Sequence, residues 1–371
     1  MRVIPKSIQS DKVKSYNIGL ALLKIWMCFE IILDHYKNWD DLFIESLHGP
    51  FNIYKILISY GDPAVPIFML IAFILSDMET VVQDKTKIEK RFYRLLVPTF
   101  FWAVVYYVFL GIFDIIFDRH YIHGITDLFW QLALGHSYNL SLWFQTDLIL
   151  LTIIFIVLFK YFNNRIALIL SALFAYFALF LQYSSMILDS LLLLAWPETM
   201  FGGFFSPSYI IYPVGRLFEM MPYAVIGIFY CHFRILARLE RIRKYAIIAS
   251  TSMLIFLLTY SEYFFAPRGF DYQGLYYIAV AVATVNLFYL LPFVRFSSLL
   301  NSTIVKISNH TMAIYFMHKL VGTILYDTKL WLLFKMRRGS LYDCLIIFCI
   351  SFFSSCLLSK LPFKIVKVSM S

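Results

Sequence analysis

Long apolar runs dominate the chain, and they set the first expectation of its fold. Each run approaches the roughly 20 apolar residues that one helical membrane crossing needs. The ten runs cover residues 17–36, 60–77, 95–117, 143–161, 166–183, 214–231, 245–264, 275–293, 310–333 and 342–360. Two shorter apolar pieces, residues 51–59 and 186–196, fit an interfacial or re-entrant position. The pattern predicts an all-α fold, a polytopic membrane helix bundle of about ten transmembrane helices.

Composition supports this interpretation. Of 371 residues, 61% are hydrophobic and 15% are charged, and the mean hydropathy is +0.73. In soluble domains the apolar share is nearer half. We therefore expect one membrane domain over residues 17–361 with short tails at 1–16 and 362–371, rather than two or three soluble domains.

The net charge of +9 does not indicate a nucleic-acid partner. The basic residues stand in short clusters between apolar runs, as the positive-inside rule predicts for cytoplasmic segments. Most of the 32 Lys and Arg residues fall where an inside N-terminus would place the cytoplasm. The segment 329–338 is discordant, because its four basic residues would lie outside. We expect both termini in the cytoplasm and membrane lipid as the surrounding partner.

The five cysteines lie in or beside apolar runs and form no CxxC pair. Their spacing indicates neither a disulfide framework nor a zinc site. We expect no metal cofactor.

The first apolar run, residues 17–36, carries Lys24, Glu30, Asp34 and His35. Each charge near the middle of a spanning helix costs about 2.5–3.5 kcal/mol, so a plain anchor would not retain four ionisable groups. Lys24 and His35 return to nearly the same helix face, about 16 Å apart along the axis. Imidazole accepts a proton at neutral pH, which makes His35 the candidate base. The alternative is that Lys24, Glu30 and Asp34 snorkel or pair with other helices.

A basic cluster, Lys90, Arg91 and Arg94, precedes Pro98 at the predicted cytoplasmic end of the third run. Such a cluster suits phosphate groups, since Arg offers bidentate contacts. Positive-inside charge accounts for the same cations equally well.

Polar residues also interrupt the fourth and sixth runs. Trp143 fits an interfacial aromatic, but Asp147 inside the run needs a partner. Arg216 and Glu219 stand at i, i+3 near the predicted external side. They either pair with each other or grip a polar substrate.

In the ninth run, Thr311, Tyr315 and His318 share one helix face. A second intramembrane histidine beside Lys319 indicates function, and a structural hydrogen bond is the alternative.

Together these residues resemble the membrane acyltransferase-3 family. The Lys24-x10-His35 spacing is similar to the Arg-x10-His signature of that family. VPIFMLIAF, KRFYRLLVPTFFW and ISNHTMAIYFMHKL follow in the order of its later blocks, and LWF at 142–144 is similar too. Two departures stand out, because Lys24 replaces the usual Arg and Ile71-Ala72 replaces Ser-Gly.

The resemblance implies acyl transfer from a cytoplasmic acyl-CoA, usually acetyl-CoA, to a hydroxyl of a cell-surface or lipid-linked glycan. His35 would be the general base or the acyl acceptor, with Lys24 as its catalytic partner. Donor contacts are expected from Lys90, Arg91, Arg94, Tyr315 and His318. Acceptor contacts are expected from Glu30, Asp34, Trp143, Arg216 and Glu219. We expect a multi-pass protein of a bacterial cytoplasmic membrane, and a homo-oligomer is compatible with the sequence.

Two other functions use similar residues. A transporter or flippase for a lipid-linked sugar or small anion also needs intramembrane charge, but we find no internal pseudo-symmetry of the kind such folds show. A glycan polymerase would be expected to place a large external loop with several Arg, whereas Arg119, Arg216 and Arg268 stand alone in their loops.

Overall fold

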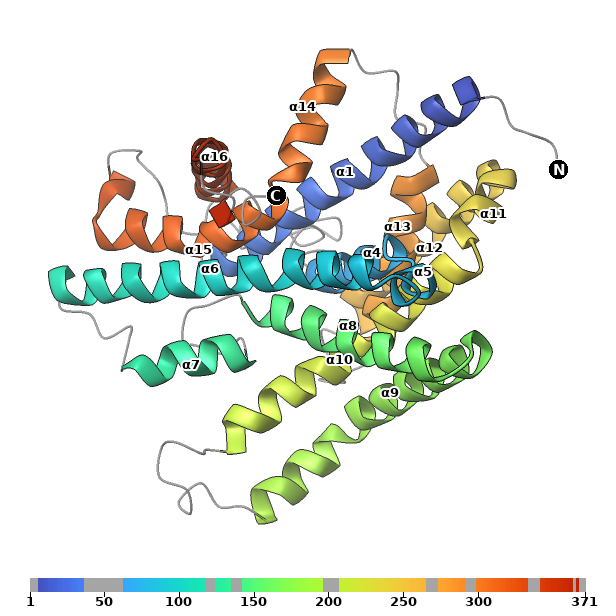
Figure 1. The fold of residues 1–371 in the computed structure, drawn as a ribbon, viewed down its shortest axis with the longest axis horizontal. Helices are drawn as coiled ribbons and strands as arrows, with labels where there is room; N and C mark the ends of the chain where they lie inside the picture. The colour runs from blue at the N-terminus through green and yellow to red at the C-terminus, as the bar shows by residue number, and fades with distance from the viewer. Residues whose placement is uncertain are drawn as a thin grey trace.

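The computed structural model describes residues 6–36, 63–117, 124–134, 142–195, 207–264, 273–290, 298–332, 341–362 and 365–366. This part of the chain is 92% helical and contains no strand. The all-α prediction is confirmed (Figure 1).

The helices follow one another with short breaks along the described chain (Figure 1). Their bounds are α1 Lys6–Tyr36, α4 Ala64–Ile74, α5 Met78–Val82, α6 Lys85–Phe117, α7 Ile125–Leu134, α8 Trp143–Tyr161, α9 Asn164–Ala195, α10 Pro207–His232, α11 Ile235–Arg241, α12 Arg243–Phe264, α13 Gln273–Leu290, α14 Ser298–Asn309, α15 Thr311–Asp327, a 3-10 turn at Leu330–Leu332, and α16 Leu341–Leu358.

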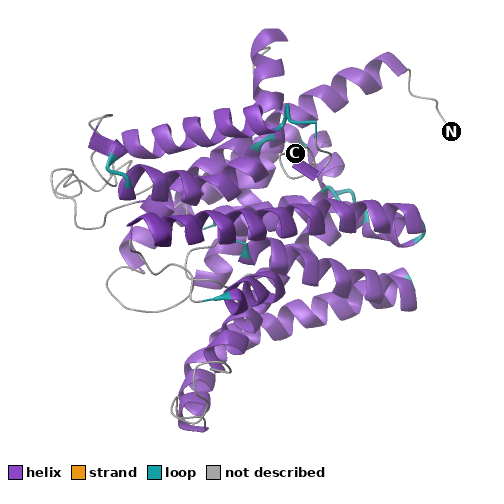
Figure 2. Ribbon diagram, turned by 60° about the vertical axis from the view of Figure 1, so that its left-hand side comes forward, coloured by secondary structure: helices purple, strands orange, loops and turns teal. Residues whose placement is uncertain are grey.

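Helix α1 packs against several other helices. It contacts α4, α13, α14, α15 and α16. Figure 2 shows the described helices gathered into a bundle, seen from another side. Helix α10 packs mainly on α4 and α9, and α12 packs on α13. Among the polar residues of this part of α1, Glu30 is buried and Lys24 and Asp34 are half-buried, whereas His35 is exposed at the helix end.

Three described helices are long and apolar enough to cross a membrane: α6, α8 and Asn164–Leu181 of α9. A fourth is added if Gly215–His232 and Ile235–Arg241, bent by 61°, count as one span. Shorter apolar helices, Ala64–Ile74, Leu275–Leu290 and Tyr342–Leu358, coincide with three further predicted runs. These helices support a membrane protein, while the count of ten spans and the cytoplasmic termini stay predictions.

The second predicted run is shorter in the structure than in the sequence pattern. Helix α4 ends at Ile74, and α5 starts anew after Asp77, whose Oδ1 accepts from the Thr80 amide at 3.3 Å. Asp is a preferred N-cap residue because its carboxylate satisfies a free amide of the first turn. The cap therefore favours a break in the helix here.

Helix α6 begins ten residues before the predicted run and continues through Pro98. Asp84 precedes it, and its Oδ1 accepts from the Thr86 amide at 2.9 Å and from the Thr86 hydroxyl at 2.7 Å. These bonds hold the pKa of the exposed Asp84 carboxyl below its ordinary value. The basic cluster consequently belongs to the same rigid helix as the membrane span.

Other predicted pieces have different outcomes. Residues 186–195 continue α9 instead of forming a separate interfacial piece. Residues 51–59, and most of the discordant 329–338 segment, lie outside the described residues.

The start of α1, α5 with the start of α6, the α8–α9 junction and α11 lie on the same side of the bundle (Figure 1). This is the side that the sequence assigns to the cytoplasm.

Candidate active site

The structure brings together two histidines that are far apart in the sequence. His35 lies in the last turn of α1, and His318 lies in the middle of α15. Their rings stack at 5.2 Å between centroids with 8° between the planes. His35 is exposed at the helix end, whereas His318 is 0% exposed. One imidazole is therefore open to a reactant and is backed by a buried one.

Backbone contacts fix the orientation of His318. Its Nδ1 is 2.5 Å from the Tyr315 carbonyl oxygen, and only a protonated nitrogen can donate to that acceptor, which assigns the tautomer. Nε2 is then the basic nitrogen. It is buried and has no hydrogen-bond partner among the described residues.

Helices α1 and α15 meet closely around this pair. The Tyr36 hydroxyl donates to the His318 carbonyl oxygen at 3.1 Å. A Cβ on Gly322 would collide with that hydroxyl and with the Tyr36 ring. Glycine at 322 therefore permits the approach that stacks the histidines. Closer to the N-terminal ends of the same two helices, the Cys28 thiol contacts the Thr311 carbonyl oxygen at 3.4 Å. Because Cys28 precedes Tyr36 and Thr311 precedes His318, α1 and α15 run parallel.

A cavity of about 170 Å³ lies beside α1 and is walled by α4, α8 and α15. Its lining includes Lys24 and Ile31 of α1, Ser308 of α14 and Thr311 of α15. On α1, His35 follows Ile31 by one helical turn. Along α1, the lining residues thus run from Lys24 toward His35.

Glu30 and Asp34 do not line this cavity. Glu30 is 0% exposed, and neither carboxylate oxygen has a hydrogen-bond partner among the described residues. Asp34 is half-buried in the last turns of α1.

The predicted basic cluster separates into two kinds of residue. Arg91 donates to Thr152 Oγ1 through Nη2 at 3.0 Å and to Ser76 Oγ through Nη1, and its guanidinium lies 5.5 Å from the Phe73 ring centroid. It therefore joins α6 to α8 and to the end of α4. Lys90 and Arg94 are exposed on α6.

The partner of Asp147 on α8 is a residue far away in the chain. Arg216 Nε on α10 is 4.0 Å from Asp147 Oδ2, and both residues are buried. The Arg216 guanidinium also lies 5.1 Å from the Trp143 ring centroid, a cation–π distance. Glu219, one turn along α10, is exposed.

Aromatic rings connect these groups. The Tyr315 ring is 5.8 Å from that of His318 and 5.9 Å from that of Phe144. Phe144 in turn contacts the Trp143 ring at 6.5 Å. The histidine pair, the cavity and the Trp143–Arg216 group therefore form one continuous region.

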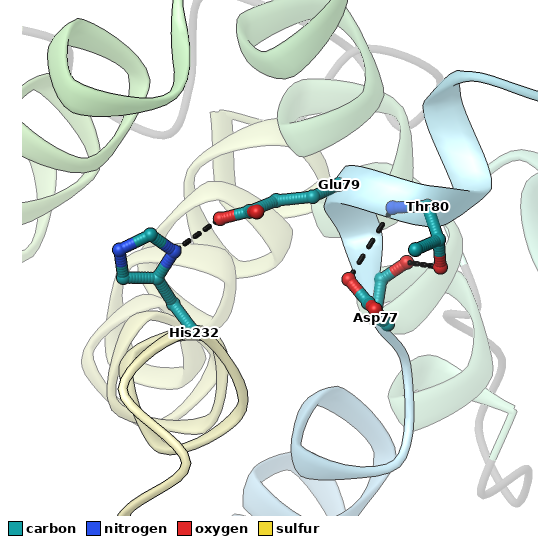
Figure 3. A network of polar contacts seen from close by, with 4 residues as sticks. All are labelled: Asp77, Glu79, Thr80 and His232. Carbon is teal, nitrogen blue, oxygen red and sulfur yellow. Dashed lines mark hydrogen bonds and ion pairs between the residues drawn. The ribbon is translucent and has the colours of Figure 1, made fainter. Parts of the chain in front are cut away.

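On the side of the bundle that carries α5, a separate polar contact joins distant segments (Figure 3). The carboxylate of Glu79 on α5 pairs with Nδ1 of His232 at the end of α10. Asp77 meanwhile caps Thr80 in the same helix (Figure 3). This contact secures α5, and sequence reasoning missed it because both residues lie outside the apolar runs. Among the described residues, no His, Cys, Asp and Glu side chains are grouped to hold a metal.

Apolar helices with ionisable side chains buried between them define the class, a helical membrane protein with a polar interior site. The acyltransferase-domain model of the acyltransferase-3 family matches residues 17–361, nearly the whole chain, and the protein belongs to that family. Comparison with curated proteins gave no match, and comparison with solved structures gave none either. The resemblance stated from the motifs is confirmed, and membrane acyltransferase activity in general follows from it.

Proposed function

We propose that the protein transfers an acyl group, with acetyl-CoA as the donor, from the cytoplasmic side to a hydroxyl of a cell-surface or lipid-linked glycan. The observation that carries this proposal is the cavity whose lining residues on α1 run from Lys24 to Ile31, one helical turn before the stacked His35. A donor and an acceptor would meet at that point from opposite sides of the bundle.

The donor side uses the start of α6 and the cavity. Lys90 and Arg94 are exposed and are available for the CoA phosphates. Arg91 is occupied by Thr152 and Ser76 and orders the α4–α5 junction beside Leu75, which lines the cavity. The slender pantetheine arm would then follow the mostly apolar cavity past Lys24.

The proposed reaction balances without a cofactor. His35 accepts the proton of the acceptor hydroxyl while the oxygen attacks the thioester carbonyl, the C–S bond breaks, and the proton finally reaches the CoA thiolate. An acyl-His35 intermediate is the alternative route to the same products. Lys24 lies about 16 Å along the helix from His35, which favours donor binding over contact with the reacting oxyanion.

His318 is proposed as a positioning residue behind His35. Burial away from water disfavours a charge on the His318 ring, and a neutral ring stacked at 5.2 Å does not oppose the positive charge that His35 gains. The stack also limits rotation of the His35 ring.

The acceptor side would use Trp143, Arg216 and Glu219. An aromatic face next to charged hydrogen-bonding groups suits a sugar, and Arg216 is held in place by Asp147. Glu30 and Asp34 lie away from the cavity, and a role for them in acceptor binding stays a prediction.

Mass analysis of the host's surface polysaccharide, with and without this protein, tests the proposal. We expect one acyl substituent per repeat to disappear when the protein is removed and to return with the wild-type chain. Unchanged acylation together with less surface glycan would contradict it and would favour the flippase.

A further inference from the structure

A short helix, α11, leaves the bundle at a steep angle to the helix before it. Gly215–His232 of α10 and Ile235–Arg241 of α11 are bent by 61° against each other. Arg234, between them, has a left-handed backbone with a φ of 49°, which is uncommon for a residue other than glycine. With α10 as a membrane span, this bend turns α11 toward the membrane plane, on the side that the sequence assigns to the cytoplasm (Figure 1).

Arginine and apolar side chains occupy opposite sides of α11. Three exposed arginines are spaced at i, i+4 and i+7, namely Arg234, Arg238 and Arg241. At about 100° per residue they fall within roughly 60° of one another around the helix. On the opposite side Leu236 is buried and Ile235 and Leu239 are half-buried, where α11 packs on α12 and α13. The outer side of the helix is therefore cationic, and we call its three arginines the arginine face.

The arginine face is not neutralised from within the protein. Among the residues that the structure describes, no carboxylate forms an ion pair with these three guanidinium groups. The one acidic residue of α11, Glu240, is exposed and lies about 120° away around the helix. Arg243 differs, because its Nε donates to the Leu290 carbonyl oxygen at 2.7 Å. Together with the exposed Lys244, the arginine face presents four cations to an anion outside the protein.

Exposed apolar side chains flank the arginine face at both ends. Phe233 is 42% exposed before α11, and Ile242 and Tyr245 are 54% and 74% exposed after it. Cations beside exposed apolar and aromatic side chains are typical of helices at the boundary between lipid headgroups and acyl chains. The arrangement matches a partner that is both anionic and apolar, which is the chemistry of an acidic phospholipid.

We infer that α11 forms a binding site for anionic phospholipid. The arginine face and Lys244 contact the phosphate and the acidic headgroup, and Phe233, Ile242 and Tyr245 contact the acyl chains. Arg binds phosphate through paired hydrogen bonds, and a cluster of four or more cations beside the cytoplasmic end of a span attracts acidic lipid. The site is independent of the proposed acyl transfer.

The lipid site adjoins the contact that secures α5. Helix α11 starts three residues after His232, whose Nδ1 pairs with the Glu79 carboxylate (Figure 3). A ligand that binds the folded protein stabilises it by mass action. Anionic lipid should therefore raise the unfolding temperature, which provides the readout.

The test follows thermal unfolding of the purified protein in neutral detergent while dioctanoyl-phosphatidylglycerol, dioctanoyl-phosphatidylcholine or inorganic phosphate is added. Phosphatidylglycerol should give a saturable rise in unfolding temperature, and the other two should have little effect. One cation near an anionic membrane surface strengthens binding by roughly fivefold. Arg238→Gln with Arg241→Gln should thus raise the half-saturating concentration of phosphatidylglycerol about tenfold or more. Arg238→Lys with Arg241→Lys keeps both charges and should raise it less.

The matched control is Lys160→Gln with Arg165→Gln, which removes two exposed cations at the α8–α9 junction on the same side of the bundle (Figure 1). Its half-saturating concentration should equal that of the wild type. An equal loss in this control would reduce the effect to general positive charge and overturn the site. An equal rise with inorganic phosphate overturns the lipid assignment, and an equal rise with phosphatidylcholine overturns the role of charge. A wild-type protein that phosphatidylglycerol does not stabilise overturns the inference outright.

Discussion

His318 is a buried imidazole within the apolar run of α15. His318 donates to the Tyr315 carbonyl oxygen and stacks on His35, so the energy of burying it is offset by one hydrogen bond and one ring contact. We propose that it supports His35 through contact and orientation, since the planes of the two rings are stacked on each other.

Substitutions of His318 test whether its ring orients the His35 ring or only fills space in the bundle. His318→Ala should lower kcat by roughly 10²-fold or more with little change in KM for the donor, because His35 loses its support. His318→Phe keeps a ring for stacking and should retain more activity. Steady-state kinetics of both variants decides this, and equal losses in Ala and Phe would rule out a role through stacking.

The basic cluster gives a second prediction for single residues. Arg91→Ala should lower the free energy of unfolding by about 1–3 kcal/mol, because the buried hydroxyl of Thr152 and the half-buried hydroxyl of Ser76 lose their donor. Lys90→Ala with Arg94→Ala should weaken CoA binding and leave the unfolding temperature unchanged. Thermal unfolding with and without CoA measures both effects. If CoA still raises the unfolding temperature of the Lys90→Ala, Arg94→Ala double variant, the two residues do not bind CoA, and their charge serves only the membrane orientation.

At the scale of helices, two glycines allow neighbouring helices to approach each other closely. Gly322 on α15 faces Tyr36 of α1, and a Cβ on Gly227 of α10 would lie 2.7 Å from the Leu70 carbonyl oxygen of α4. Small residues at such contacts let helix backbones approach in membrane proteins. These contacts hold α1 and α4, two of the helices that line the cavity.

Alanine at either glycine should therefore be unfavourable. Gly227→Ala and Gly322→Ala should each destabilise by about 1–3 kcal/mol, the usual range for overpacking. Gly215→Ala is the matched control, because nothing lies within 4 Å of its added Cβ. Thermal unfolding in detergent gives the comparison, and unfolding temperatures equal to that of the control would contradict these packing assignments.

The sequence predicted individual helices better than their contacts. The stripe of Lys24 and His35 could be found because both lie on one helix, where periodicity relates them. The stacking of His35 on His318 and the pairing of Asp147 with Arg216 could not, because each joins helices far apart in the chain. Phe68 and Phe144, which line the cavity, also went unrecognised, since an aromatic in an apolar run gives no sign of which face meets a cavity.

For the whole molecule, the fold and the topology can be tested around α6, a candidate span with described residues on both sides. Gln83→Cys should react with a thiol reagent only after the cytoplasmic side is opened. The Ile125 side chain is 73% exposed. A cysteine at this position, Ile125→Cys, should therefore react with a membrane-impermeant thiol reagent applied from outside. The unsubstituted protein, with its five native cysteines, sets the background. Labelling of both positions from one side would contradict the predicted orientation.

The proposed activity depends above all on acyl transfer through His35. The most direct measurement follows radiolabelled acetyl-CoA with the wild type and His35→Ala, each reconstituted at equal amounts with the glycan acceptor. We expect label in the glycan with the wild type and a loss of about 10²- to 10⁴-fold in the variant, the usual contribution of a general base. Transfer by His35→Ala at the wild-type rate would contradict the account.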